Sequence, residues 1–245
     1  MAEETRDGKG RAEGRKGGAG RVWAETGYAV DDSRLTLRER KKLQTRQRIS
    51  GEATLLFIER GFDNVTVAEV ARAAEVSTMT VFNYFPRKED LFLDRIPEGQ
   101  ELITHAIRER GADESPLAAL RRLALDLLAQ RHPLAGVRED FTYFWRTVLE
   151  SPALRARGRE AVEEIEGVLA GLLAKAAGDD AGARRGDAGD PGLAAALIVA
   201  AYRVAYAGAA ARLLAGDPVD EVAVEQAAVL ERTFDALERA LSGGG

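Results

Sequence analysis

Several side chains in one short stretch of this sequence are of the types that contact nucleic acids. They are Thr78, Met79, Thr80, Asn83 and Tyr84, which supply hydroxyls, a thioether, an amide and a phenol. Hydroxyls and amides hydrogen-bond to base edges and phosphate oxygens, and an asparagine can bind adenine through two hydrogen bonds in the major groove. A helix that presents these groups together is a candidate DNA-binding surface, although such a face also occurs in ordinary structural packing.

Two helix-start signals precede and frame this stretch. Thr66 and Glu69 form a capping box, in which the threonine hydroxyl accepts from a backbone N–H and the glutamate caps the threonine amide. Ser77 is a second N-cap eleven residues later. Because the link between the two short helices has room only for a tight turn, the pattern predicts a helix-turn-helix over 66–85. Its interior is expected to hold Val70, Ala71, Ala74, Val76, Val81 and Phe85.

The charge distribution places a basic segment just before this motif. Residues 34–48 contain seven arginines or lysines and one acid, whereas the whole chain has a formal net charge of −5. Such asymmetry lets one end approach a polyanion while the rest of the surface keeps the protein soluble. A solvated helix face is the alternative explanation of the basic segment by itself.

Composition excludes several chemistries. The chain has no cysteine, so it has no disulfide, no thiolate nucleophile and no cysteine-based zinc site. His105 and His132 are its two histidines, which makes a histidine-rich metal site or a catalytic constellation unexpected. The N-terminus lacks the apolar core of a signal peptide, and the alanine-rich stretch near 193–202 is the longest apolar run. We expect a cytoplasmic protein without cofactor, metal or membrane partner.

Helical spacing of apolar residues predicts an all-α fold. The first helix runs from about Thr45 to Gly61, and Pro97 should kink or split a later one. Further helices are predicted at about 66–73, 77–85, 88–109, 115–131, 137–150, 152–177, 192–215 and 219–242. The predicted domains are a disordered tail over 1–33, a DNA-binding domain over 34–95 and a helical ligand-binding and dimerisation domain over 96–245. A mobile loop is expected over 178–191, where Gly, Asp and Arg are dense.

Residues 42–100 resemble the N-terminal domain of the tetracycline-repressor (TetR) family. The resemblance implies a three-helix DNA-binding head on a larger helical domain that dimerises and usually holds an effector pocket. The residues that carry it are Ile49, Ala53, Leu56, Phe57, Gly61, Phe62, Val65, Thr66, Val67, Val70, Ala71, Ala74, Val76, Ser77, Thr80, Phe82, Tyr84, Phe85, Lys88, Glu89 and Leu91.

The resemblance also implies roles for individual residues. Phosphate contacts are implied for Thr45, Arg46, Thr66, Val67 and Lys88, and contacts to bases for Thr78, Met79, Thr80 and Asn83, with Tyr84 close by. Ser77 is a further candidate DNA-binding residue. The chain departs from the family pattern in two places. Glu75 stands where the family usually has a glycine and would have to adopt a positive φ, at a cost of roughly 1 kcal/mol. Phe82 replaces the usual tyrosine, which removes a hydroxyl and leaves a packing role.

The C-terminal half offers weaker signals. Aromatic residues gather at Phe141, Tyr143, Phe144 and Trp145, and they either line a ligand cavity or form ordinary core. Phe141, Phe144, Trp145 and Arg203 are the candidate ligand-binding residues. On the last predicted helix, Leu230, Phe234, Leu237 and Leu241 form an apolar stripe that we expect to join 193–215 in a four-helix dimer interface.

These patterns favour one function and leave two alternatives. The favoured hypothesis is a homodimer that binds a roughly palindromic operator and acts as a repressor, released by an apolar or aromatic small molecule. One alternative is a constitutive DNA-binding or protein-interaction module with a filled C-terminal core. The other, disfavoured by the missing catalytic groups, is a small helical enzyme.

Overall fold

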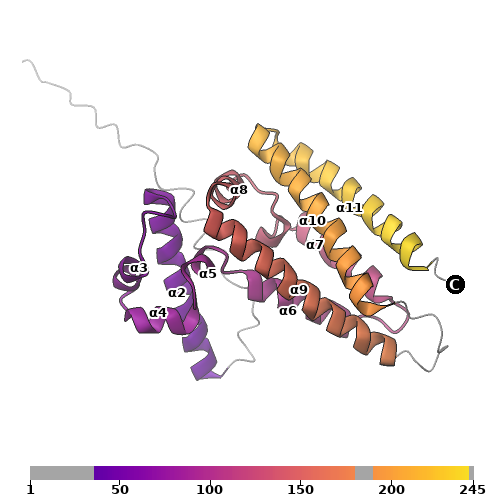
Figure 1. Cartoon of the computed structure of the whole chain (residues 1–245), viewed down its shortest axis with the longest axis horizontal. Coiled ribbons are helices and arrows are strands. Elements are labelled where there is room, and N and C mark those ends of the chain that lie inside the picture. Colours follow the sequence, from indigo (N-terminus) through magenta and orange to yellow (C-terminus); the bar gives the residue numbers. More distant parts are fainter. Residues whose placement is uncertain (1–35, 180–189, 243–245) are drawn as a thin grey trace, which may run out of the picture.

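The computed structural model describes residues 36–179 and 190–242, which form helices joined by turns and contain no strand (Figure 1). The tail predicted over 1–33 and most of the loop predicted over 178–191 lie outside the described residues. The elements in chain order are α2 (Leu37–Arg60), α3 (Val67–Ala73), α4 (Thr78–Tyr84), α5 (Lys88–Phe92), α6 (Ile96–Arg108), α7 (Pro116–Ala129), the 3-10 turn η2 (Pro133–Ala135), α8 (Phe141–Glu150), α9 (Pro152–Asp179), α10 (Pro191–Ala215) and α11 (Val219–Ser242).

The first helix begins earlier than the apolar spacing predicts. Thr36 caps α2, since its hydroxyl accepts from the Glu39 amide while the Glu39 carboxylate accepts from the Thr36 amide at 2.8 Å. This capping box adds two turns before Thr45, the predicted start. The described part of the basic segment, residues 36–48, therefore lies on α2 and its cap, with Arg38, Arg40, Lys41, Lys42 and Arg48 exposed.

The head consists of α2, α3, α4 and α5 and has its own core. The capping box at Thr66 and the Ser77 cap are both present, as predicted. Glu75 in the turn between α3 and α4 has φ 53°, which confirms the positive φ expected there. The core contains Ile49, Ala53, Phe57, Phe62, Val65, Val70, Ala71, Ala74, Val81, Phe85 and Leu91 from the head, together with Leu154 from α9.

Proline and glycine set two helix boundaries that follow the head. The helix predicted over 88–109 is divided into α5 and α6, and Pro97 lies in the first turn of α6, as its missing N–H requires. The helix predicted from 137 begins instead at Phe141. The η2 turn precedes it and ends at Gly136, which has a left-handed φ of 69°.

The body is formed by α6 to α11. Helices α9, α10 and α11 pack side by side, and α7 packs against α6 and α11. The head lies beside the N-terminal end of α9, on the side away from α10 and α11 (Figure 1). Their buried apolar side chains form a second core that runs from Ile107 to Leu237. Leu154 at the start of α9 is fully buried in the head core instead, so α9 contributes to both parts of the molecule.

The apolar stripe predicted to form the dimer interface lies inside the chain. Leu230, Phe234 and Leu237 are 2%, 3% and 7% exposed and pack in the body core, with Leu241 against it. The amphipathic pattern correctly identified a buried face, but α11 turns that face toward its own α7 and α10. The expectation that this stripe contacts a second subunit is therefore wrong.

Among the body helices, α10 carries most of the exposed large apolar side chains. Leu193, Leu197 and Val204 on α10 are 58%, 39% and 69% exposed, and Val224 on α11 is 75% exposed. By length and composition α10 could cross a membrane. Its opposite face, however, packs against α8, α9 and α11 and places residues such as Ile198 in the body core.

Candidate DNA-binding face and ligand cavity

Helix α4 presents the polar residues that the sequence singled out. Ser77 begins the helix, because its hydroxyl accepts from the Thr80 amide at 3.0 Å and lies 2.8 Å from the Thr80 hydroxyl. Thr78, Met79 and Asn83 are exposed, and Thr80 and Tyr84 are partly exposed. Val81 on the opposite side is fully buried in the head core, which fixes the outward face.

Phe82 belongs to the exposed face of α4 rather than to the packed one. Its side chain is 43% exposed, and Met79 three residues earlier is 69% exposed. Residues three apart on a helix are neighbours on its surface. The expectation that Phe82 keeps only a packing role is therefore wrong, and the face carries an apolar pair able to contact thymine methyl groups.

The start of α3 is held by a closed hydrogen-bond network. The Glu69 carboxylate accepts from the Thr66 amide at 2.8 Å and from the Thr66 hydroxyl at 2.7 Å, and Arg60 pairs with it at 2.8 Å. The Thr66 hydroxyl and amide, followed by Arg60, lower the pKa of Glu69 to about 2. The cap keeps Thr66 exposed and Val67 partly exposed at the helix N-terminus, where first-turn N–H groups attract anions.

Thr45 and Lys88 lie at the surface of the head. The Thr45 hydroxyl donates to the Lys41 carbonyl at 2.9 Å within α2. The Lys88 ammonium lies 4.3 Å from the centre of the Phe62 ring, a cation–π contact. Partial burial lowers the pKa of Lys88, whereas the nearby Asp63 carboxylate acts to raise it.

Arg46 points inward, in contrast to the phosphate contact that the resemblance implies. Its guanidinium donates to the Tyr84 carbonyl at 2.9 Å and to the Asp94 carbonyl at 3.0 Å. It also lies 4.1 Å from the centre of the Phe85 ring. Arg46 thus ties the last residue of α4 to the connection between α5 and α6.

Asp94 in that connection makes a second link to α2. Its carboxylate accepts a short hydrogen bond from the Ser50 hydroxyl. Burial raises the pKa of Asp94, although the Ser50 hydrogen bond and Arg95 oppose the shift. Ser50 and Asp94 both lie on the wall of a large cavity in the body.

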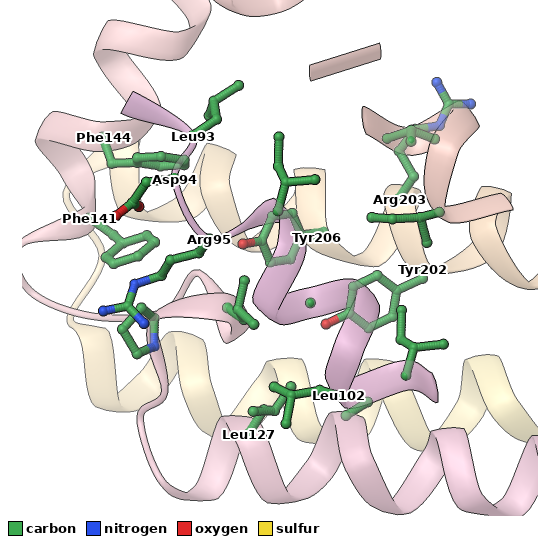
Figure 2. Close-up of a pocket in the computed structure, with 18 of the residues that line it drawn as sticks. Leu93, Asp94, Arg95, Leu102, Leu127, Phe141, Phe144, Tyr202, Arg203 and Tyr206 are labelled. Atoms are coloured by element: carbon green, nitrogen blue, oxygen red, sulfur yellow. The ribbon is translucent and has the colours of Figure 1, made fainter. Parts of the chain in front are cut away.

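This cavity has a volume of about 400 Å³, within the roughly 300–1,000 Å³ typical of small-molecule sites. Its wall is formed by α2, the α5–α6 connection and the helices α6 to α11, so it reaches from the head into the body (Figure 2). Phe141, Phe144 and Arg203, which the sequence singled out, lie on this wall.

Trp145, the fourth candidate, stands behind the cavity wall. Its indole N–H donates to the Gly136 carbonyl at 3.1 Å. Its ring meets those of Tyr206 and Phe144 edge to face, with centroids 4.9 and 5.2 Å apart. Trp145 therefore supports lining residues without facing the cavity itself.

The polar groups of the cavity include two tyrosines that sequence reasoning missed. Tyr202 and Tyr206 lie one turn apart on α10, with nearly parallel rings whose centroids are 5.8 Å apart. Burial raises the pKa of Tyr202 to about 12 and raises that of Tyr206 further. Tyrosines four residues apart in an otherwise apolar helix were the available signal.

Comparison with known proteins places this head in a family. A family model for bacterial regulatory proteins of the tetR family matches residues 51–94, which span the end of α2, the helix-turn-helix and α5. The chain belongs to the TetR family. Its helical body is also of the TetR type: the TetR-family repressor FadR of Thermus thermophilus, solved with lauroyl-CoA, is 26% identical, with a TM-score of 0.51 over 78% of this chain and 92% of that one. A TetR-family protein from Syntrophomonas wolfei shares the fold at a TM-score of 0.54 and 20% identity.

The curated TetR-family relatives match part of their length. The transcriptional regulator TcmR of Streptomyces glaucescens is 34% identical over 147 residues, which are 59% of this chain and 65% of the relative. BetI of Pseudomonas aeruginosa is 30% identical over 107 residues, or 42% of this chain and 54% of the relative. The chain thus matches less than two thirds of either protein. The TetR family consists of regulators and not of enzymes.

Proposed function

We propose that this TetR-family chain binds operator DNA in the cytoplasm and acts as a repressor. The observation that carries the proposal is the outward face of α4, where Thr78, Met79 and Asn83 are exposed beside Phe82. The capped helices and the packed head core hold this face rigid, which favours recognition of base edges in a major groove. The exposed basic residues of α2 supply contacts to phosphates.

Gel-shift titrations test this proposal with a duplex enriched from a random library. Asn83→Ala should reduce discrimination between the selected and unrelated duplexes by roughly 5- to 100-fold, because a base contact is lost. Lys42→Ala should weaken binding to both duplexes alike and lower the log–log salt slope by about 0.9. Arg232→Ala, on the exposed side of α11, is the control. Affinity that does not depend on salt would refute the proposal.

We also propose that the operator-binding form is a homodimer joined through α10 and α11. Support comes from the exposed apolar residues Leu193, Leu197 and Val204 of α10 and Val224 of α11, since exposed apolar surface on neighbouring helices is typical of protein–protein interfaces. Val204→Glu should shift the protein to monomers in sedimentation. Leu149→Glu, which places the same charge on the exposed side of α8, should leave the dimer intact. A dimer that survives Val204→Glu together with Val224→Glu would place the interface elsewhere.

A ligand in the body cavity is proposed to release the operator. The cavity wall includes Ser50 of α2 and Asp94, while Arg46 joins the Asp94 carbonyl to the end of α4. A ligand that shifts the α5–α6 connection therefore shifts the recognition helix as well. The lauroyl-CoA in the Thermus FadR structure shows that a similar fold holds a small molecule.

The ligand step has its own test. A molecule that stabilises the protein in a thermal-shift screen should weaken operator binding, and operator should weaken its binding by the same factor. A ligand that binds the cavity without changing operator affinity would support a constitutive DNA-binding protein instead.

A further inference from the structure

We propose that the ligand of this cavity is an uncharged, largely apolar molecule whose oxygen atoms accept hydrogen bonds from Tyr202 and Tyr206. The inference rests on the proposed cavity ligand and names its chemical class. Both tyrosines line the cavity, and Figure 2 shows their hydroxyl oxygens directed into it from α10.

The two hydroxyls are donors that the protein leaves unused. Within residues 36–179 and 190–242, neither phenol has a hydrogen-bond partner, and each ring is enclosed among the apolar side chains of the body core. Both oxygens border the cavity, so a ligand that displaces water from it without supplying an acceptor would leave them unpaired, which is unfavourable. The high pKa of each phenol keeps it protonated at neutral pH, so it offers an O–H donor to an acceptor on the ligand.

The surroundings of Tyr206 fix the direction of its hydroxyl. The rings of Trp145 and Tyr202 both pack against its ring, with centroids 4.9 and 5.8 Å away. The ring also lies against the backbone of Gly136, where an added Cβ would come within 2.6 Å of the tyrosine oxygen. The Trp145 hydrogen bond to the Gly136 carbonyl holds this arrangement in place. A donor fixed in advance costs little entropy to use, which favours a specific acceptor.

The charged groups on the cavity wall do not favour a charged ligand. The Asp94 carboxylate accepts a hydrogen bond from Ser50, and Arg95 forms an ion pair with Glu98 at 2.7 Å. The Glu98 carboxylate also lies 3.4 Å from His132, so it already has two partners. Arg203 is exposed, and Figure 2 shows its guanidinium directed away from the two tyrosine hydroxyls. An ionised ligand would lose its hydration without gaining a partner near the tyrosines.

Fluorescence titration with Nile red tests the inference, because this dye is uncharged, aromatic and carries a carbonyl oxygen. The full chain should bind it, and Tyr202→Phe and Tyr206→Phe should each raise the dissociation constant by about 5-fold or more, since each removes one donor. Tyr143→Phe is the matched control, because its hydroxyl donates to the Phe57 carbonyl and not to the cavity. It should leave dye binding unchanged.

Thermal melting without dye distinguishes a ligand-binding role of the two tyrosine hydroxyls from a structural one. Tyr202→Phe and Tyr206→Phe should keep or raise the melting temperature, because each removes a hydroxyl that has no partner in the described residues. Tyr143→Phe should lower it. If the two cavity variants melt earlier and bind dye normally, the hydroxyls are structural and the inference is wrong.

Charged probes should bind weakly and without dependence on the two tyrosines. Laurate and lauroyl-CoA should bind more weakly than Nile red and should be insensitive to both tyrosine changes. Tighter binding of either anion would overturn the inference. Because these titrations need no DNA, their result is independent of operator release: tyrosine-dependent dye binding that leaves operator affinity unchanged would uphold the ligand class and reject the repressor mechanism.

Discussion

The head and the body of this protein use their apolar residues in opposite ways. The head fills its interior with apolar side chains, of which Phe57, Val70 and Val81 are fully buried. The body surrounds a cavity of about 400 Å³ and directs phenol hydroxyls into it. The contrast agrees with the two proposed functions: dense packing supports the proposed DNA-binding face, while the proposed ligand site gives up packing and keeps donors available.

The largest expected difference between the two regions is in the response to lost side-chain volume. Leu154→Ala should lower the free energy of unfolding by about 3 kcal/mol, because it empties a fully buried site in the head core. Leu127→Ala, on the cavity wall, should cost about 1 kcal/mol, since one side of that leucine already faces space. Urea denaturation measures both values. Equal losses would mean that the body is packed as densely as the head.

Arg46 joins the two regions, so its removal should have the next largest effect. Arg46→Ala should lower the free energy of unfolding by about 2 kcal/mol through the loss of its hydrogen bonds to the Tyr84 and Asp94 carbonyls. The salt slope of DNA binding should stay unchanged, because Arg46 faces the interior. Arg48→Ala is the control, and its exposed side chain should affect DNA binding more than stability. A reduced salt slope for Arg46→Ala would show that Arg46 contacts a phosphate after all.

The smallest expected effect concerns the turn inside the head. Glu75 has a φ of 53°, which glycine adopts without the steric cost of a side chain. Glu75→Gly should therefore raise the free energy of unfolding by up to about 1 kcal/mol, partly offset by the greater freedom of the unfolded chain. Thermal melting of the variant measures the change. A clear loss of stability would show that the glutamate side chain stabilises the turn.

The sequence predicted the head better than the body because the head is specified locally. The Thr66 capping box, the Ser77 cap and the positive φ at Glu75 each depend on a few neighbouring residues, and all three are present. Pro97 likewise marked the break between α5 and α6. The early start of α2 had an equally local signal at Thr36 and Glu39, which apolar periodicity alone does not detect.

What the sequence could not supply depends on contacts between distant segments. An arginine near the predicted start of a helix is compatible with phosphate binding or with an inward role, and only the approach of Tyr84 and Asp94 decides for Arg46. The apolar stripe on α11 shows a buried face but not whether the partner is α7 and α10 or a second subunit. For the same reason the sequence could not show that Tyr206 lines the cavity while Trp145 packs behind its wall.

The position of Leu154 bears on how readily heads and bodies can be exchanged between relatives. A chimera joined at the α5–α6 connection would keep the recognition helix but fill the head core with a residue from a foreign α9. Arg157, one turn further on, also reaches back to Asp90 of α5 at 2.7 Å. The unit that can be transplanted intact is therefore discontinuous in the chain: it comprises the head and the first two turns of α9, and the evolution of one constrains the other.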